Sequence, residues 1–258
     1  MFKRIYFFDI ESIPPPEELR PLLKPELIRK LQAISFPRRA GLLPNGDSDD
    51  ERKPEAACKE CTDEQFRRLA LYAEYGRVLT IGVIVEQGSQ ILHQGVLGRD
   101  RSTGKFHLNE TRTLRGFWNL LKNFNTGCDL IVGHNIMDFD LPFVYNRSRI
   151  IGVRPTIQFN FARYRSAPIY DTMREWAHWN PHAVCISLAH LAEVLKVGIS
   201  KTEGMDGSHV YDEFMAGHDD LIAEYCMRDV EVTRAIYYRM NFLDEVRLTD
   251  EKSVLRST

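Results

Sequence analysis

The segment that most constrains the fold is the N-terminal run KRIYFFDIES, residues 3 to 12. Aromatic and β-branched residues dominate it, which predicts a central strand buried on both faces. Because side chains alternate along a strand, Asp9 and Glu11 should share one face, opposite Phe8 and Ile10. Two carboxylates side by side at a buried strand repel each other and lose hydration, and a divalent cation would relieve both costs. A polar strand end leading into the following proline-rich loop is the simpler alternative.

Composition limits the classes of partner. The chain has 258 residues, 27% of them charged, and a formal net charge of −2, so any basic surface for nucleic acid must be local. No apolar run approaches the roughly 18 residues of a membrane span, and the N-terminus lacks the apolar region of a signal peptide. We therefore expect no membrane partner and a cytoplasmic location. Cys58 and Cys61 form one isolated CxxC, for which a zinc site is not expected.

Hydrophobic periodicity predicts an α/β chain. Further strands are predicted at 77–86 and 90–97, joined by a turn at 87–89, and at 128–132 and 169–170. Helices are predicted near 111–124, 140–150, 172–178, 187–196 and 219–241. Three antiparallel strands, followed by alternating helices and parallel strands, are therefore expected within one domain spanning residues 1–258.

A polar excursion at about 13–76 interrupts this pattern and is interpreted as an insertion into that domain. It begins with several prolines, continues with a short helical stripe at Leu27–Ile34, and becomes an acidic, flexible loop at 44–61. A second helix is predicted to start at Thr62, where Thr62-x-x-Gln65 forms a capping box, and to end at Gly76.

Two further acids stand where chemistry is expected. Asp140 follows the strand 128–132, and ligand sites in open α/β sheets usually lie beyond the carboxyl ends of the strands. Alternatively, it is a sound N-cap for the next helix. Asp229 stands within the apolar stripe of the helix 219–241, with Tyr225 one turn earlier on the same face. A carboxylate there costs several kcal/mol unless it binds a metal or pairs with a basic residue from elsewhere.

Taken in order, the motifs Asp9-Ile10-Glu11, Asn135-x-x-x-Phe139-Asp140 and Tyr225-x-x-x-Asp229 resemble those of the DEDD superfamily of 3′→5′ exonucleases, in its tyrosine subclass. The histidine subclass carries His five residues before the last Asp, where this chain has Glu224. The first two motifs look like the proofreading domain of family B DNA polymerases. The run 201–210, with Tyr225-Cys226, resembles stand-alone bacterial proteins related to that domain. The resemblance implies an RNase H-like mixed sheet flanked by helices.

The resemblance also implies a set of site residues and a cofactor. The catalytic residues would be Asp9, Glu11, Asp140, Tyr225 and Asp229, with the four acids binding two Mg²⁺ or Mn²⁺ ions. Asp9 would bridge both ions, Glu11 and Asp229 would complete the first, and Asp140 would hold the second largely through water. Tyr225 would orient the attacking water. Asn135 and Phe139 match positions that contact the terminal nucleotide, although Phe139 also fits plain core packing.

A basic segment provides the local positive charge. From 147 to 165 there are five arginines, no acids and three interleaved aromatic residues, the combination used by single-strand channels. The candidate nucleic-acid contacts are Arg147, Arg149, Arg154, Arg163 and Arg165. A solvated surface over core aromatics is the alternative. Thr172-x-x-Glu175 is a capping box, so Asp171 and Thr172 are interpreted as a helix start, and His134 as a loop residue.

These observations predict a metal-dependent 3′→5′ exonuclease acting on the 3′ ends of single-stranded DNA, with RNA as a possible substrate. An exoribonuclease is the nearest alternative, and a catalytically silent nucleic-acid-binding module is the alternative from another class. Since 258 residues leave no room for a polymerase domain, the chain is expected to work alone or with a separate partner.

Overall fold

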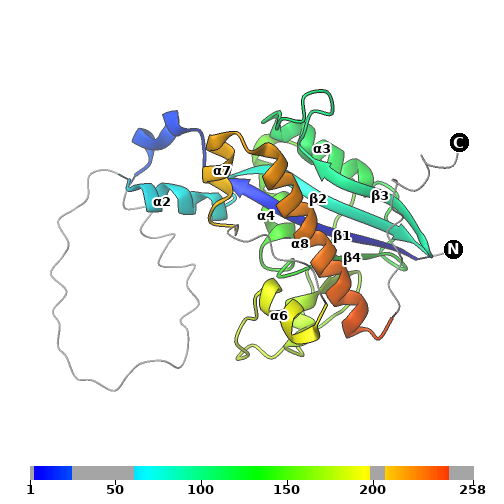
Figure 1. Ribbon diagram of the computed structural model, residues 1–258. Helices are drawn as coiled ribbons and strands as arrows, with labels where there is room; N and C mark the ends of the chain where they lie inside the picture. The colour runs from blue at the N-terminus through cyan, green and yellow to red at the C-terminus, as the bar shows by residue number, and fades with distance from the viewer. Residues whose placement is uncertain (1–2, 25–60, 198–206, 244–258) are drawn as a thin grey trace, which may run out of the picture. The chain divides into compact units, whose positions relative to one another are not determined.

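A computed structural model of the chain describes residues 3–24, 61–197 and 207–243 (Figure 1). The chain divides into two compact units, one comprising Ile13–Arg77 and the other comprising Met1–Ser12 and Val78–Thr258. The prediction that 13–76 is an insertion into a single domain stays a prediction. No helix in the described ranges combines the length and the hydropathy that a bilayer crossing requires.

The larger unit is built on one five-stranded sheet with the order β3-β2-β1-β4-β5. Its strands are β1 (Arg4–Ile13), β2 (Arg77–Gln87), β3 (Gln90–Leu97), β4 (Leu130–Gly133) and β5 (Ile169–Asp171). β2 and β3 form an antiparallel hairpin, while β4 lies parallel to both β1 and β5. β1 and β2 point in opposite directions in Figure 1. The predicted mixed α/β sheet, antiparallel first and parallel later, is confirmed.

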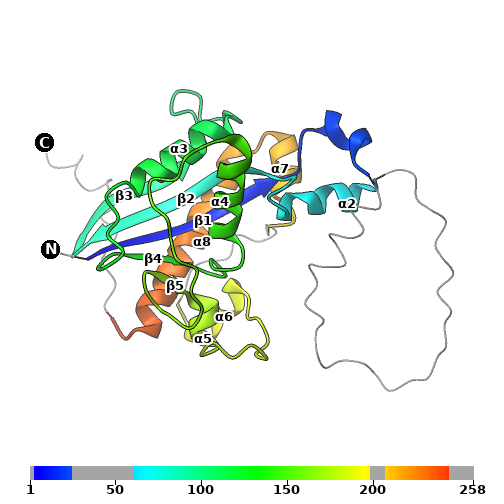
Figure 2. The same cartoon turned by 180° about the vertical axis from the view of Figure 1, so that it is seen from behind.

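Helices cover both faces of this sheet. They are α3 (Glu110–Leu120), α4 (Asp140–Ile151), α5 (Thr172–Trp176), α6 (Leu188–Leu195), α7 (Val210–Ala216) and α8 (Asp219–Met240). α8 crosses one face in Figure 1, whereas α3 and α4 cover the other in the reverse view of Figure 2. β1 is buried by both layers. Phe8 packs on Phe117 of α3 with ring centroids 5.0 Å apart, and Phe7 packs on Tyr237 of α8 at 5.5 Å.

The smaller unit contains the short helices η1 (Glu17–Leu22), α2 (Asp63–Arg68) and η2 (Leu69–Leu71). The predicted capping box is confirmed: the Thr62 hydroxyl accepts from the Gln65 amide, and Thr62 N–H donates to the Gln65 side chain. The predicted end at Gly76 is wrong, since α2 ends at Arg68. Gly76 instead packs against η2, where an added Cβ would lie 2.7 Å from the Ala70 carbonyl oxygen.

Other local predictions also differ from the structure. α5 is capped by Asp171, which accepts from the Met173 and Arg174 amides, rather than by a Thr172 capping box. α7 was not predicted, because its seven residues carry too short a periodic pattern. α8 is buried more widely than one stripe, since every residue from Val232 to Tyr238 is buried between the sheet and its neighbouring helices. The stripe at Leu27–Ile34, residues 44–60 and Cys58 lie outside the described residues.

Candidate active site

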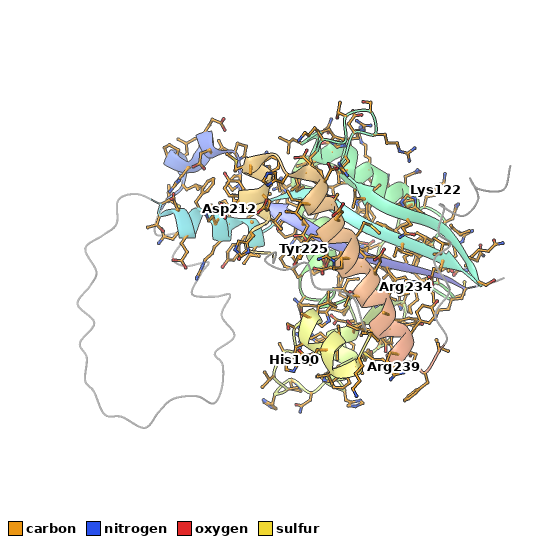
Figure 3. The ribbon with its side chains drawn as sticks, viewed as in Figure 1. Lys122, His190, Asp212, Tyr225, Arg234 and Arg239 are labelled. Atoms are coloured by element: carbon orange, nitrogen blue, oxygen red, sulfur yellow. The ribbon has the colours of Figure 1, made fainter. Side chains whose placement is uncertain are left out.

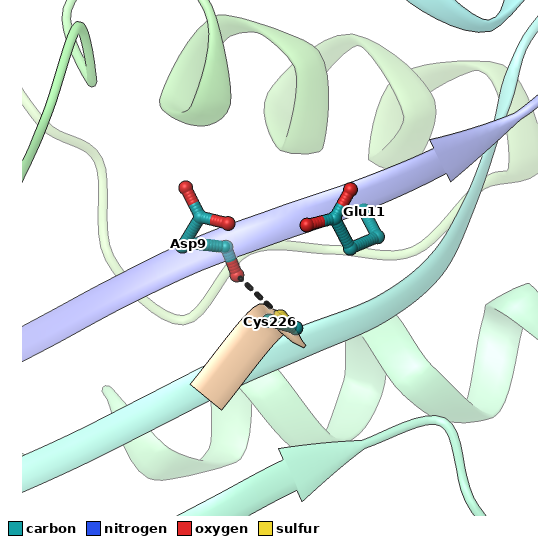
Figure 4. Close-up of side chains that lie close together, drawn as sticks. All are labelled: Asp9, Glu11 and Cys226. Carbon is teal, nitrogen blue, oxygen red and sulfur yellow. Dashed lines mark hydrogen bonds between the residues drawn. The ribbon is translucent and has the colours of Figure 1, made fainter. Parts of the chain in front are cut away.

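Asp9 and Glu11 project from the part of β1 that extends past the end of the shorter strand β4. The parallel register pairs Ile5 with Leu130 and Phe7 with Val132, and β4 ends at Gly133. By strand alternation, both acids lie on the side of Phe7, beneath α8. Carboxylate oxygens of Asp9 and Glu11 lie within 4.8 Å of each other and of the Cys226 sulfur (Figure 4).

Helix α8 brings Tyr225, Cys226 and Asp229 to this face of β1, and Gly82 of β2 permits the close approach. A Cβ at Gly82 would lie 2.9 Å from Val230 Cγ2 and 3.0 Å from Cys226 Sγ, so only a glycine lets the helix pack this near the strand. Tyr225 lies in the first half of α8 in Figure 3. Its hydroxyl is hydrogen-bonded to the Asp229 carboxylate one turn later.

Asp140 reaches the same region from the first turn of α4. It is not an N-cap, because Phe139 occupies that position and makes no side-chain cap. Instead, Asp140 Oδ1 accepts a hydrogen bond of 3.2 Å from the Ile10 amide of β1. That amide lies beyond the end of the β4 ladder, so the carboxylate supplies the partner that a neighbouring strand would otherwise supply. Asp140 is buried, with 3% of its surface exposed.

All four acids have raised pKa values. Burial raises the pKa of Asp9 well above its usual range, and the charges of Asp140, Glu11 and Asp229 raise it further. Burial, followed by the charges of Asp229 and Asp140, likewise raises the pKa of Glu11. Burial raises the pKa of Asp140 to about 7 and that of Asp229 to about 6. This concentration of buried acid is the arrangement that a bound cation would stabilise.

Cys226 is a member of the cluster that sequence reasoning did not select. Its side chain is fully buried, and its thiol donates to the Asp9 carbonyl oxygen at 3.8 Å (Figure 4). Burial and the neighbouring charges of Asp9 and Glu11 raise the pKa of the thiol well above its usual range. Because the thiol stays protonated, Cys226 lines the site as a neutral side chain. Its position next to Tyr225 in the sequence was the signal that could have identified Cys226 as a member of the site.

The loop between β4 and α4 is held by Asp171. This fully buried carboxylate accepts from the amides of Asn135 and Met137, both at 3.1 Å, while it caps α5. Asn135 has a left-handed backbone with φ of 61°. Phe139 is half-buried, and its ring packs against Phe143 with centroids 5.5 Å apart. The interpretation of Asp171 as a helix start is confirmed, and the structure adds that it anchors this loop.

Comparison with known proteins places the chain in a family. Residues 70–256 match a family described as "predicted 3'-5' exonuclease related to the exonuclease domain of PolB". The chain belongs to this family. Asp140, Tyr225 and Asp229 of this PolB-related family member lie within the matched range. Asp9 and Glu11 precede the matched range, and in the fold β1 brings them next to the other acids.

One solved structure that resembles this PolB-related family member is the family B DNA polymerase of the hyperthermophilic archaeon Pyrobaculum calidifontis, with a TM-score of 0.52 and 18% sequence identity. The similarity covers 93% of this chain and 24% of the polymerase chain. At that identity it establishes the fold alone, and it confirms the predicted fold class. No curated protein matches the chain.

The predicted arginine contacts of this PolB-related family member separate into two groups. The structure argues against Arg147, because its side chain is buried and makes a two-pronged ion pair with Glu110, with bonds of 2.8 and 2.6 Å. The remaining arginines are exposed and accessible to a ligand: Arg149, Arg154, Arg163 and Arg165. His134 bonds to Thr172 and to the Ile186 carbonyl, and therefore supports the loop.

Proposed function

We propose that the protein is a 3′→5′ exonuclease that uses two divalent metal ions to hydrolyse the terminal phosphodiester bond of single-stranded DNA. The observation that carries the proposal is the convergence of four acids from three elements. Asp9 and Glu11 come from β1, Asp140 from α4 and Asp229 from α8. Carboxylate oxygens of Asp9 and Glu11 lie within 4.8 Å of each other, and burial together with the charges of Asp140 and Asp229 raises the pKa of both.

The donor set fits Mg²⁺ or Mn²⁺. Carboxylate oxygens are hard ligands, which these ions prefer, and the one sulfur in the cluster is a neutral thiol bonded to the Asp9 carbonyl oxygen. Asp9, Glu11, Asp140 and Asp229 would hold the ions. When bound, the ions would neutralise charge on the phosphate and lower the pKa of the attacking water.

Tyr225 is suited to positioning that water rather than to removing its proton. Burial and the charge of Asp229 raise the pKa of the phenol above its ordinary value near 10, so it stays protonated at neutral pH. Because its O–H donates to Asp229, its oxygen can accept a hydrogen bond from water. Phe139, supported by Phe143, offers a partly exposed ring on which the terminal base could stack.

Metal dependence is the direct test. A 5′-labelled single-stranded DNA should shorten stepwise from its 3′ end with Mg²⁺ or Mn²⁺, and should remain intact in EDTA. A 3′-labelled copy should release its label first as a mononucleotide, which separates exonuclease from endonuclease cleavage. Asp9→Asn should be inactive, whereas Glu224→Gln, which changes an exposed acid on the same helix as Asp229, should retain activity.

Each other outcome assigns a different function. Stepwise cleavage in EDTA would contradict the metal-dependent site. Cleavage of a matched RNA strand with the DNA left intact would make the protein an exoribonuclease. Binding without cleavage, with every divalent ion tried, would make it a nucleic-acid-binding module.

A further inference from the structure

A pocket of about 380 Å³ opens between the loop before α4, helix α4 itself, residues 161–164, and α5 with the residues that follow it. Its volume falls within the roughly 300–1,000 Å³ of sites that bind small molecules. None of the four candidate metal-binding acids lines it. The pocket is therefore distinct from the carboxylate cluster.

Aromatic rings form much of the pocket wall. Tyr164 and Trp179 lie with ring centroids 5.7 Å apart at 46°, and Tyr145 and Phe161 at 5.6 Å and 75°. Tyr164 is 69% exposed, so core packing does not explain its placement. Tyr164 and Trp179 both have left-handed backbones, with φ of 63° and 57°, which is unfavourable for bulky side chains. The chain thus holds an exposed tyrosine against a half-buried tryptophan, both in a strained backbone conformation, a feature that often accompanies a binding site.

The pocket also carries uncompensated positive charge, because three arginines line it and one aspartate does. Arg174 and Arg163 both contact Asp138, the latter at 3.4 Å. Arg149 bonds to the neutral Asn146 side chain at 3.0 Å, and no acid in the described part of the chain pairs with it. A ligand that matches these walls has a flat ring and an anionic group, as a nucleotide does.

We propose that this pocket binds one nucleotide of the substrate strand upstream of the scissile bond. The base stacks on the Tyr164–Trp179 pair, and its phosphate is held by Arg149 and Arg163. The inference rests on the proposed function, since a 3′→5′ exonuclease holds the 3′-terminal nucleotide at its metal site. The rest of the strand then extends only toward its 5′ side.

One short loop joins the pocket to the carboxylate cluster. Asp138 and Met137 line the pocket, and Asp140 follows two residues after Asp138. Asp171 fixes the loop through the Met137 amide at 3.1 Å. A strand engaged in the pocket therefore lies next to the segment that carries Asp140. Strands too short to reach the pocket lose its contribution to binding.

Binding in EDTA tests the pocket without requiring cleavage. Anisotropy of a labelled oligothymidylate should show Tyr164→Ala binding about 5- to 150-fold more weakly than the wild type, the range for loss of one base stack. Tyr164→Phe keeps the ring and should bind as the wild type does. The same comparison on labelled dithymidylate should show no difference between Tyr164→Ala and the wild type. Trp176→Ala removes a neighbouring exposed ring that does not line the pocket, and should leave binding unchanged.

The arginines are tested by salt dependence on the same oligonucleotide. Arg149→Gln and Arg163→Gln should each reduce the slope of log affinity against log salt by about 0.7, as expected for one lost phosphate contact on a single strand. Arg115→Gln, on the exposed surface of α3, should leave the slope unchanged. Matched DNA and RNA strands show whether the pocket distinguishes the sugar.

The outcomes separate the two proposals. If the wild type cleaves but Tyr164→Ala binds long strands as tightly as the wild type, the pocket proposal is overturned and the exonuclease stands. If the wild type binds and shows the Tyr164 effect but cleaves nothing, the exonuclease proposal fails, and the pocket stands as a single-strand binding site without a scissile bond beside it. The pocket proposal is also overturned if the wild type does not bind single strands. It is likewise overturned if Tyr164→Phe and Tyr164→Ala lose the same amount of binding affinity.

Discussion

Tyr225 and Asp9 lie in the same cluster but should contribute very different amounts. Tyr225 presents a protonated hydroxyl bonded to Asp229, and its role is limited to holding one water. The charges of Asp140, Glu11 and Asp229 all add to the effect of burial in raising the pKa of Asp9, so this acid lies within range of all three others. Removing Asp9 should therefore disturb every cation position at once.

Replacing Tyr225 by Phe should slow cleavage without abolishing it. One orienting hydrogen bond contributes about 1–3 kcal/mol, or about 5- to 150-fold in rate. Asp9→Ala should lose several further powers of ten and be indistinguishable from buffer. Single-turnover rates on one oligonucleotide at saturating Mn²⁺ measure both. Equal inactivity of the two folded variants would show that Tyr225 does more than position water.

At the scale of elements, the site depends on how closely α8 packs on the sheet. Gly82 of β2 lies beneath Cys226 and Val230 of the helix, and Cys226 contacts Asp9 of the adjacent strand. The buried ion pair between Glu86 and Arg234, with the Tyr238 hydroxyl donating to Glu86 at 2.5 Å, joins the same two elements further along. These contacts hold α8 close to β2 and β1. Figure 3 shows Tyr225 and Arg234 at successive points along this helix.

Gly82→Ala should push α8 away from the sheet and lower the cleavage rate, although it replaces none of the four acids. Its Cβ would lie 2.9 Å from Val230 Cγ2 and 3.2 Å from the Cys226 carbonyl oxygen, so the helix must shift. We expect the free energy of unfolding to fall by about 1–3 kcal/mol. We expect the rate to fall by about 10²-fold for a displacement near 1 Å. Thermal melts and single-turnover rates provide the two measurements.

Gly116→Ala is the matched control. Gly116 lies within α3, and the nearest side-chain atom to its added Cβ would be 3.7 Å away. Alanine is the better helix former, so stability should rise by up to about 1 kcal/mol with no change in rate. Unchanged stability and cleavage rate in Gly82→Ala would show that the site does not depend on the close packing of α8 against Gly82.

For the whole molecule, the acid cluster couples stability to pH and to metal. In the metal-free protein, a folded-state pKa above the unfolded value means that the fold favours the protonated acid. That contribution is fully present below about pH 4 and is lost as the pH rises through the folded values of about 7 for Asp140 and about 6 for Asp229. Stability thus falls as the pH rises, whereas a salt-bridged acid with a lowered pKa makes stability rise with pH.

Asp140→Asn should therefore stabilise the metal-free protein, and by more at pH 8 than at pH 5. The amide oxygen can still accept from Ile10, and the buried charge is removed, so a gain of about 2–4 kcal/mol is expected at pH 8. Thermal melts in EDTA across this pH range measure the gain, and Glu224→Gln should show none. Adding Mn²⁺ at pH 8 should raise the wild-type melting temperature more than that of Asp140→Asn. A pH-independent difference would contradict the linkage.

The sequence by itself determined what short-range periodicity encodes. Strand alternation placed Asp9 and Glu11 on one face, helical spacing aligned Tyr225 with Asp229, and the order of elements indicated the mixed sheet. These patterns depend on residues two to four positions apart, and local backbone geometry sets them before any packing occurs.

Only the tertiary structure decided which side chains meet across the fold. The bond from Ile10 to Asp140 joins residues 130 positions apart, and it brings the Asp140 carboxylate to β1 in place of the helix-cap alternative that the sequence left open. Glu110 removed Arg147 from the candidate contacts, while Trp179 joined Tyr164 to form the pocket wall. Such pairings depend on where whole elements come to rest, because a side chain's partner and exposure are properties of the packed chain rather than of its neighbours in sequence.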